Sequence, residues 1–179
     1  FEIDRQQPGL ESWLSEYFQI RVKLKQNTKT GYPDDTNAVG PTIISTATIE
    51  TVASWFPDIT VEEMRLRLRA NLEIDGVPAF WEDRLFNEEG EAVPFYIGNV
   101  LLTGINPCQR CVVPTRDSQT GIGDPQFTKT FIAKRQETLP QWTNRDRFNH
   151  FYRLSVNTKV PPSEAGKSIH IGQKVKVQK

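Results

Sequence analysis

The residues best suited to chemistry are the two cysteines of the chain, Cys108 and Cys111, in the segment NPCQRC (106–111). Two thiols at this spacing can form a disulfide, half of a zinc site, a redox pair, or a reactive thiolate with a neighbour. A zinc site needs four ligands. The only histidines, His150 and His170, lie far from the cysteines in the sequence, so the pattern argues against zinc.

The neighbours of the cysteines favour a thiolate over a redox pair. A redox pair of the thioredoxin type opens a helix, whereas the residues after Cys111 are Val-Val-Pro and predict a strand. Arg110 and Arg116 lie close by, and cationic neighbours depress the pKa of a thiol. A soft thiolate beside anion-binding arginines suits a metal carried by a phosphorylated cofactor. The simpler alternative, two small buried hydrophobic residues, stays open.

A second candidate is the basic stretch MRLRLRANLEID, residues 64–75. As a strand, it places Arg65, Arg67, Arg69 and Asn71 on one face, because side chains alternate with a period of two. Guanidinium forks match phosphate or carboxylate, so this face is a candidate anion-binding surface. From this stretch alone, an exposed strand face paired with nearby Glu and Asp residues is favoured. If its first residues are helical, Arg65 and Arg69 still share a face.

The elements that must position these residues begin at the N-terminal end. Segment 9–18 has apolar residues at helical spacing, which predicts a helix. Segment 19–25 alternates apolar and basic residues, which predicts a strand with one exposed face. A polar loop over 26–40 leads to a short buried strand at 41–45.

Capping residues then predict two helices. Ser45 or Thr46 caps a helix over 46–56, which stops at a proline. Thr60 with Glu63 forms a capping box for a short helix that begins there.

The rest of the chain is strand-like, with Gly, Pro and Asp turns, apart from a short helix predicted over 138–147. One helical part followed by many strands predicts an α+β, mainly β domain built on a strongly bent sheet or barrel. The predicted strands are 65–75, 94–105, 111–116, 150–156 and 171–177.

Length and charge narrow the function classes. The 179 residues predict one domain, and 22 basic residues balance 22 acidic ones, so neither nucleic acid nor membrane is expected as a partner. No apolar run reaches the roughly 20 residues that cross a bilayer. Few cysteines favour a reducing, cytoplasmic location. The start, FEIDRQQPGL, lacks Met and predicts that the chain is a fragment of a longer protein.

Taken together, the motifs resemble the MOSC domain, named for the C-terminus of molybdenum cofactor sulfurase. RLRLRANLEIDGVPAFWEDRLF and YIGNVLLTGINPCQRCVVPTRDSQTG carry the family's Arg-x-Arg-Pro-Asn strand, Pro-Cys-x-Arg-Cys segment and Asp-x-x-Thr-Gly turn, in order. KSIHIGQKVKV is similar to the closing strand. The chain departs from the pattern at Ala70, where the family usually has Pro. The resemblance implies a single β-barrel domain over residues 1–179, with a few peripheral helices, that handles the molybdenum cofactor, a pterin with a dithiolene and a phosphate. Longer relatives carry a separate N-terminal barrel-like module, so the resemblance also implies that this chain is the C-terminal part of such a protein.

By the same resemblance, the second cysteine of the motif, Cys111, is the molybdenum ligand and the catalytic position. Relatives in the amidoxime-reducing branch reduce small N-hydroxylated substrates with electrons from a redox protein or domain. In sulfurases, the domain is instead a non-catalytic binding module or sulfur carrier, acting on sulfur-containing substrates beside a pyridoxal-phosphate domain. A cofactor-free remnant is a third alternative. The implied cofactor contacts are Arg65, Arg67, Arg69, Asn71, Cys108, Gln109 and Arg110.

Overall fold

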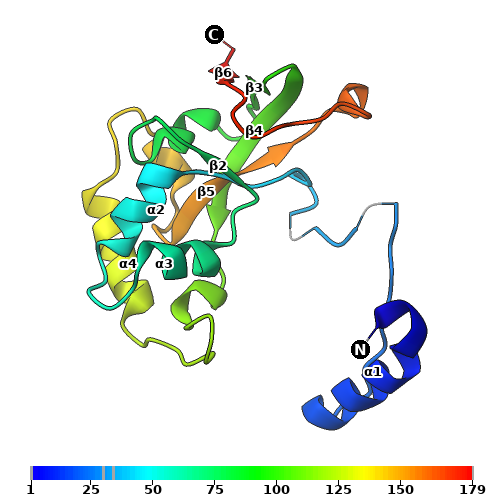
Figure 1. Cartoon of the computed structure of the whole chain (residues 1–179). Coiled ribbons are helices and arrows are strands. Elements are labelled where there is room, and N and C mark those ends of the chain that lie inside the picture. The colour runs from blue at the N-terminus through cyan, green and yellow to red at the C-terminus, as the bar shows by residue number, and fades with distance from the viewer. Residues whose placement is uncertain (1, 30, 34, 179) are drawn as a thin grey trace. The chain divides into compact units, whose positions relative to one another are not determined.

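The computed structural model describes residues 2–29, 31–33 and 35–178, and it divides into two compact units, Phe1–Asp34 and Asp35–Lys179 (Figure 1). Each unit is described by itself below. Among the described residues, no helix combines the length and the apolar character needed to cross a membrane. The prediction of a longer parent protein stays a prediction.

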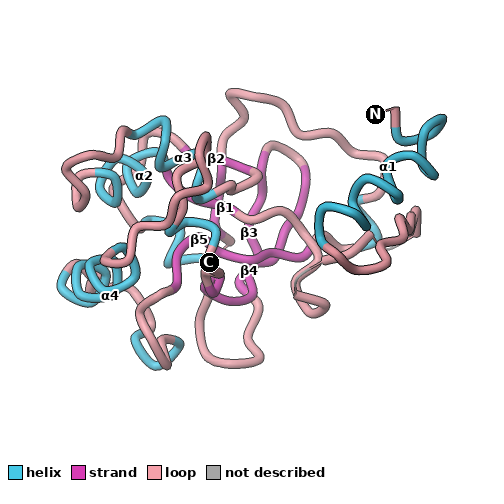
Figure 2. Tube along the Cα trace, turned by 90° about the horizontal axis from the view of Figure 1, so that it is seen from below, coloured by secondary structure: helices cyan, strands magenta, loops and turns pink. Residues whose placement is uncertain are grey.

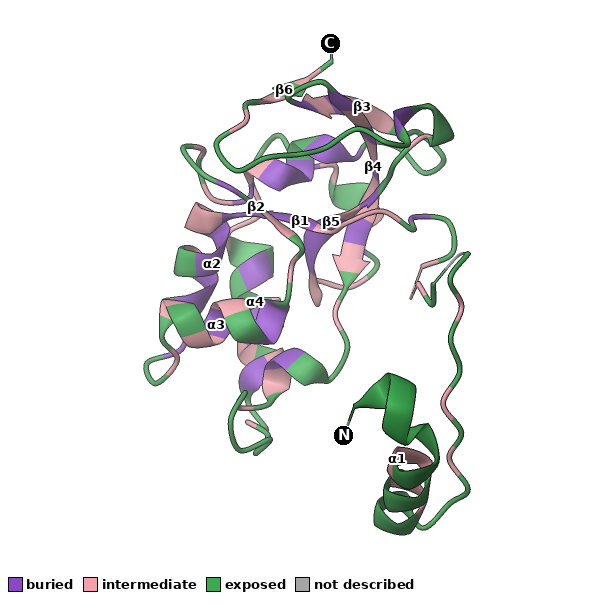
Figure 3. Cartoon of the chain, turned by 45° about the vertical axis from the view of Figure 1, so that its right-hand side comes forward, coloured by how far each residue is buried: buried purple, intermediate pink, exposed green. Residues whose placement is uncertain are grey.

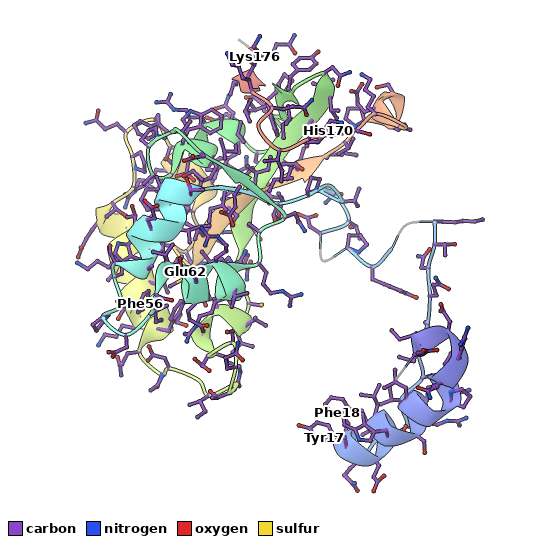
Figure 4. The ribbon with its side chains drawn as sticks, viewed as in Figure 1. Tyr17, Phe18, Phe56, Glu62, His170 and Lys176 are labelled. Atoms are coloured by element: carbon purple, nitrogen blue, oxygen red, sulfur yellow. The ribbon has the colours of Figure 1, made fainter. Side chains whose placement is uncertain are left out.

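The first unit is helix α1 (Ile3–Phe18) followed by an extended segment. The predicted helix over 9–18 is confirmed and begins earlier in the chain. The predicted strand over 19–25 is wrong, because its backbone bonds to side chains of the helix and not to a second strand. The amide of Val22 donates to Ser15 Oγ at 2.9 Å, and that of Leu24 donates to Glu11 Oε1 at 2.9 Å. Tyr17 and Phe18 end the helix with exposed side chains (Figure 4).

The second unit is built on one curled six-stranded sheet in the order β2-β1-β5-β4-β3-β6 (Figure 2). Only β1 and β2 pair in parallel, and the other neighbours are antiparallel. The mainly β, α+β class with peripheral helices is confirmed. The strands are β1 (Ile43–Ser45), β2 (Leu72–Ile74), β3 (Val93–Ile97), β4 (Val100–Gln109), β5 (Arg153–Lys159) and β6 (Val175–Val177).

Helices α2 (Thr46–Ala53), α3 (Val61–Leu68) and α4 (Phe127–Glu137) gather at one side of the sheet (Figures 1 and 2). Both predicted N-caps are confirmed: Ser45 Oγ accepts from the amide of Thr48, and Thr60 Oγ1 from that of Glu63. The Glu63 carboxylate does not complete a capping box, because it accepts from Arg67 and Ser118 instead. A cap of this kind fixes where a helix begins, because it satisfies an amide that has no partner within the helix. Sequence analysis missed α4.

Two apolar clusters form the core of this unit (Figure 3). The first joins the three helices to β1 and β5 through residues such as Ile44, Met64, Phe131 and Leu154. The second lies among β1, β3, β4 and β5. The sheet therefore supports helices on one side while its strand ends stay available for loops.

Several predicted boundaries are wrong in ways that matter for the site. Residues 65–75 are not one strand: α3 ends, Arg69 takes a left-handed conformation (φ 52°), and only Leu72–Ile74 pairs. Residues 111–116 hold the 3₁₀ helix η2 (Val113–Thr115), not a strand. Within 138–147, only Arg145–Arg147 forms a short 3₁₀ helix, η3.

The single strand predicted over 94–105 is wrong, because the chain reverses at Gly98 and forms a hairpin of β3 and β4. The φ of Gly98 is 61°, which suits a tight hairpin turn. The two remaining predicted strands exist with shifted ends. The strands predicted over 150–156 and 171–177 begin later, as β5 and β6. Gly104 on β4 is required for packing, because a Cβ there would lie 1.8 Å from the carbonyl oxygen of Leu85.

Candidate functional site

The cysteine segment lies at the end of β4, where this strand stops pairing with β5. The last register pair is Gln109 with Arg153, after an irregularity in the ladder. The amide of Arg110 then donates to the carbonyl of Tyr152 at 3.0 Å, and the chain turns into η2. Cys108 is half-buried on the strand, and Cys111 is exposed just beyond it. The fold thus presents the second thiol to solvent on a loop fixed at its first residue.

Arg110 joins this loop to the C-terminus of α3. Its Nη2 donates to the carbonyl of Leu68, and its Nη1 contacts Cys108 Sγ at 3.6 Å. A cation at a helix C-terminus is favourable, because the last carbonyls carry partial negative charge. Its Nε is buried and has no hydrogen-bond partner among the described residues. Because a buried N–H without a partner is costly, this donor marks a place for a ligand atom or water.

Arg153 is a site residue that the sequence analysis missed. Its Nη1 donates to the carbonyl of Pro107 at 2.9 Å, next to Cys108, and its Nε and Nη2 donate to Asn149 Oδ1. Burial lowers the pKa of Arg153, while the charge of Cys108 acts in the opposite direction. No local signal in the sequence identifies this residue, because its role depends on the pairing of β4 with β5.

Tyr152 lines the other side of the loop. Its hydroxyl oxygen is buried, and Thr128 on α4 lies beside it. Burial raises the pKa of Tyr152, the charge of Cys111 adds to this effect, and Arg110 opposes it. The ring of Tyr152 packs edge-on against Phe131 of α4, at a centroid distance of 5.1 Å.

The predicted row of arginines does not form. Arg65 pairs with Glu73 at 2.8 Å. Arg67 is buried between Glu63 and Asp117, 3.6 Å from the latter. Both guanidiniums are therefore neutralised by carboxylates. This agrees with the alternative prediction, in which these arginines pair with nearby Glu and Asp residues.

The Asp-x-x-Thr-Gly turn is attached to α3 through the same ion pairs. Burial opposes the ionisation of Glu63, but hydrogen bonds from Ser118 and Arg67 outweigh it and lower the pKa of this carboxyl. The amide and hydroxyl of Thr120 lower the pKa of Asp117. The turn is therefore held beside α3 by hydrogen bonds and ion pairs of two ionised carboxylates, Glu63 and Asp117.

Arg69 and Asn71 diverge after α3 ends. Arg69 is exposed at the left-handed C-cap, and its side chain makes no hydrogen bond or ion pair with the described residues. Asn71 Oδ1 accepts from the amide of Thr42 at 2.9 Å and from its hydroxyl at 3.0 Å. Of this pair, only Arg69 is free to contact a ligand through its whole side chain. Gln109 is exposed at the end of β4.

The described part of the chain holds no cluster of side chains of the kind that binds zinc. Within residues 2–29, 31–33 and 35–178, no three side chains of His, Cys, Asp or Glu lie together as metal ligands. His150 Nδ1 accepts from the amide of Tyr152 at 3.2 Å, and His170 is exposed.

A scan against protein-family models matches residues 41–176 to the MOSC domain. The chain belongs to the MOSC domain family. A search of curated proteins finds no match. MOSC domains are associated with binding of the molybdenum cofactor, and the matched residues hold the whole cysteine site, from α3 to β5.

The donor set of this MOSC domain fits an anionic cofactor with a soft metal. An exposed thiol is a suitable soft ligand, and Arg110 has a buried N–H without a partner. Arg69, Arg110 and Arg153 form no ion pair with a carboxylate of the described residues, so their charge is available to an anion.

Proposed function

We propose that this domain binds the molybdenum cofactor at the end of β4, with Cys111 as the metal ligand and catalytic position. The observation that carries the proposal is an exposed thiol directly after Arg110, a guanidinium that has no carboxylate partner among the described residues. Cofactor contacts are assigned to Arg69, Gln109 and Arg110, with Cys108 as a half-buried neighbour.

Each residue has a role that follows from its contacts. Arg110 is oriented before any ligand arrives, because Leu68 and Cys108 hold two of its nitrogens. Such pre-organisation lowers the entropic cost of binding. Arg65 and Arg67 hold α3, β2 and the Asp117 turn in place, so in this proposal they support the site and do not bind the phosphate.

The proposed activity is the reduction of small N-hydroxylated compounds with electrons from a partner redox protein. When bound, the cofactor supplies the redox chemistry, and the protein supplies binding and orientation. The domain's own residues present an exposed thiol on a loop whose backbone is fixed by the amide of Arg110, which donates to the carbonyl of Tyr152 just before β5. The open side of that loop is where substrate and electron donor would reach the cofactor.

The test is to purify the full-length protein from a host that makes the cofactor and to measure molybdenum and pterin per chain. We expect near-stoichiometric metal in the wild type, loss of metal in Cys111→Ser and a weaker loss in Cys108→Ser. Equal retention in both variants would refute the ligand assignment. A folded wild type with neither metal nor pterin would favour a non-catalytic module.

A further inference from the structure

A pocket of about 320 Å³ lies in the second unit, apart from the cysteine segment. Its walls come from the turn before β3, from Ile105 and Asn106 on β4, from Arg147 on η3 and from the loop before β1. The proposed cofactor contacts, all of which the structure describes, are not among its lining residues. Pockets of roughly a few hundred Å³ are the usual size of small-molecule sites.

Arg147 supplies the positive charge of this pocket, and backbone carbonyls hold it in place. Its Nη1 donates to the carbonyls of Asn87 and Glu88, and its Nη2 donates to that of Ile105 at 3.3 Å. No carboxylate of the described residues lies within ion-pair distance of it. A guanidinium has five N–H groups. The N–H of Nε and one N–H of Nη2 therefore remain for an anionic group.

Two carboxylates, those of Glu89 and Glu91, line the same pocket. Neither forms an ion pair with a cation of the described residues. Glu91 Oε2 accepts from a neutral donor, Asn87 Nδ2, at 2.7 Å. Glu89 is exposed, and its side chain makes no hydrogen bond with the described residues. The pocket thus holds charges of both signs that do not neutralise each other by direct contact.

The rest of the lining includes a fixed amide and an apolar wall. Asn106 Nδ2 donates to Asp35 Oδ2 at 2.9 Å, and Asn106 Oδ1 accepts from Asn157 Nδ2 at 2.9 Å. These bonds orient the amide and leave one N–H of Nδ2 for a ligand. Ala92 and Ile105 both reach solvent in the pocket, so a short apolar chain has a surface to contact there.

We propose that this pocket binds a small zwitterion, in which a short apolar chain joins one carboxylate and one ammonium group. The carboxylate meets Arg147, and the ammonium group meets Glu89 and Glu91. A ligand with a single charge faces a group of like charge in this pocket, whereas a zwitterion matches both signs. The proposal is independent of cofactor binding, because it uses none of the residues assigned to that function.

The experiment titrates glycine, β-alanine, γ-aminobutyrate and δ-aminovalerate into the isotope-labelled whole chain and follows the backbone amides by NMR. We expect one member to bind most tightly, because only one charge separation matches the distance between Arg147 and the carboxylates. The shifts should centre on residues 89–92, Ile105 and Asn106.

Single-charge analogues of the tightest member test the need for both charges. For γ-aminobutyrate, these are butyrate and butylamine. Each should bind at least roughly threefold more weakly than the zwitterion, which is the loss expected for one solvent-accessible ion pair.

Glu89→Gln tests the carboxylates with the least disturbance, because this side chain is exposed and bonds to none of the described residues. It should weaken binding of the tightest zwitterion roughly threefold. Glu88→Gln is the matched control, because it removes the same charge from the neighbouring residue, which is outside the lining and accepts from Asn144. Its affinity should equal that of the wild type.

Arg147→Gln should weaken binding about tenfold, because this guanidinium is partly buried and contacts the carboxylate. Arg145→Gln is its control, since Arg145 lies on the same short helix, stacks over Phe151 and is outside the lining. Arg147 also holds three backbone carbonyls, so circular dichroism first checks the fold of its variant. If that variant does not fold, Glu89→Gln and the single-charge analogues decide the question.

Four results would overturn the proposal. They are equal binding of the amine and the zwitterion, an equal loss in the Glu88 control, shifts centred on residues 108–111, and the absence of saturable shifts with every member of the series. Because no metal or cofactor is present in these titrations, their failure is distinct from a failure of Cys111 to hold molybdenum.

Discussion

Among single residues, the partner of each arginine decides its role. Arg65 and Arg67 lie in the basic stretch that sequence spacing marks as an anion-binding face, yet carboxylates neutralise both. Arg110 and Arg153, on β4's end and β5, have neutral partners only. Residue type and spacing cannot distinguish these cases, because the neutralising carboxylates come from other elements.

Loss of the buried Arg67 ion pairs is expected to lower stability without a direct effect on cofactor binding. Arg67→Met should lower the free energy of unfolding by about 2 kcal/mol, because Glu63 and Asp117 lose their cation in a partly buried place. Arg65→Met should cost less than about 1 kcal/mol, since its ion pair is exposed. Urea denaturation of both variants measures the difference. Equal losses would show that burial does not separate the two ion pairs.

A buried carboxyl that is not among the proposed cofactor contacts predicts a pH dependence. Glu82 Oε2 accepts from the amide of Ser45 and the hydroxyl of Thr48, while Oε1 is buried without a partner among the described residues. Burial, followed by the charge of Asp83, raises the pKa of Glu82 from 4.5 to about 7. The folded state therefore holds this proton more tightly than the unfolded state.

The sign follows from linkage. A raised carboxyl pKa makes the folded protein lose stability as the pH rises from 4.5 through about 7. Glu82→Gln removes the titration, so its advantage over the wild type should grow between about pH 5 and about pH 8, reaching about 3 kcal/mol. Urea denaturation at several pH values measures it. A constant difference across this range would contradict the assignment to Glu82.

At the scale of elements, α3 shows why the alternation of apolar residues and arginines wrongly predicted a strand. Met64, Leu66 and Leu68 alternate with arginines, which suits a strand, but the same residues also allow a helix that buries Met64 and Leu68 and exposes Leu66. The Thr60 cap and the ion pair between Glu63 and Arg67, four residues apart, decide for the helix.

The end of α3 gives a prediction that separates backbone from side chain. Arg69 has a left-handed φ of 52°, which costs an ordinary residue about 1 kcal/mol relative to Gly. Arg69→Gly should therefore raise the free energy of unfolding by up to about 1 kcal/mol and still lower cofactor retention. Thermal denaturation and metal analysis report the two effects.

Arg69→Ala is the control for this change, because it removes the same side chain but keeps the strained backbone. It should lose cofactor as Arg69→Gly does, without the gain in stability. Unchanged retention in both variants would return Arg69 to the role of an exposed cap.

Helix α4 was missed although a signal exists. Phe127, Phe131 and Arg135 recur every four residues and are all buried, as one face of a helix requires. Arg135 obscured the pattern because a charged residue suggests an exposed position. Its partner, Asp83, lies on η1 (Trp81–Leu85), 2.6 Å away, and no local pattern predicts that contact.

At the scale of the whole molecule, local features were predictable and distant ones were not. The helix caps and the cysteine segment are each contained in a few consecutive residues, so they could be located from the sequence. The contacts of Arg153 with Pro107, and of Arg110 with Leu68, require strands and helices from distant parts of the chain. The MOSC resemblance therefore pointed to the candidate site, and the fold shows which arginines there lack a carboxylate partner among the described residues.

The division into units gives a prediction for the whole chain. Both core clusters, all six strands and every proposed cofactor contact lie within Asp35–Lys179. Residues 35–179 expressed alone should therefore unfold cooperatively, and their melting temperature should stay within about 5 °C of the full chain's, close to the shift that 1 kcal/mol produces.

The same fragment tests whether the first unit contributes to the site. If the site residues named above suffice, the fragment should retain as much molybdenum and pterin per chain as the full chain, because Arg110 keeps its contact with Leu68 and Cys111 stays exposed after β4. Circular dichroism confirms folding, and metal and pterin analysis measures retention. A folded fragment with weakened retention would mean that residues before Asp35 contribute to cofactor binding.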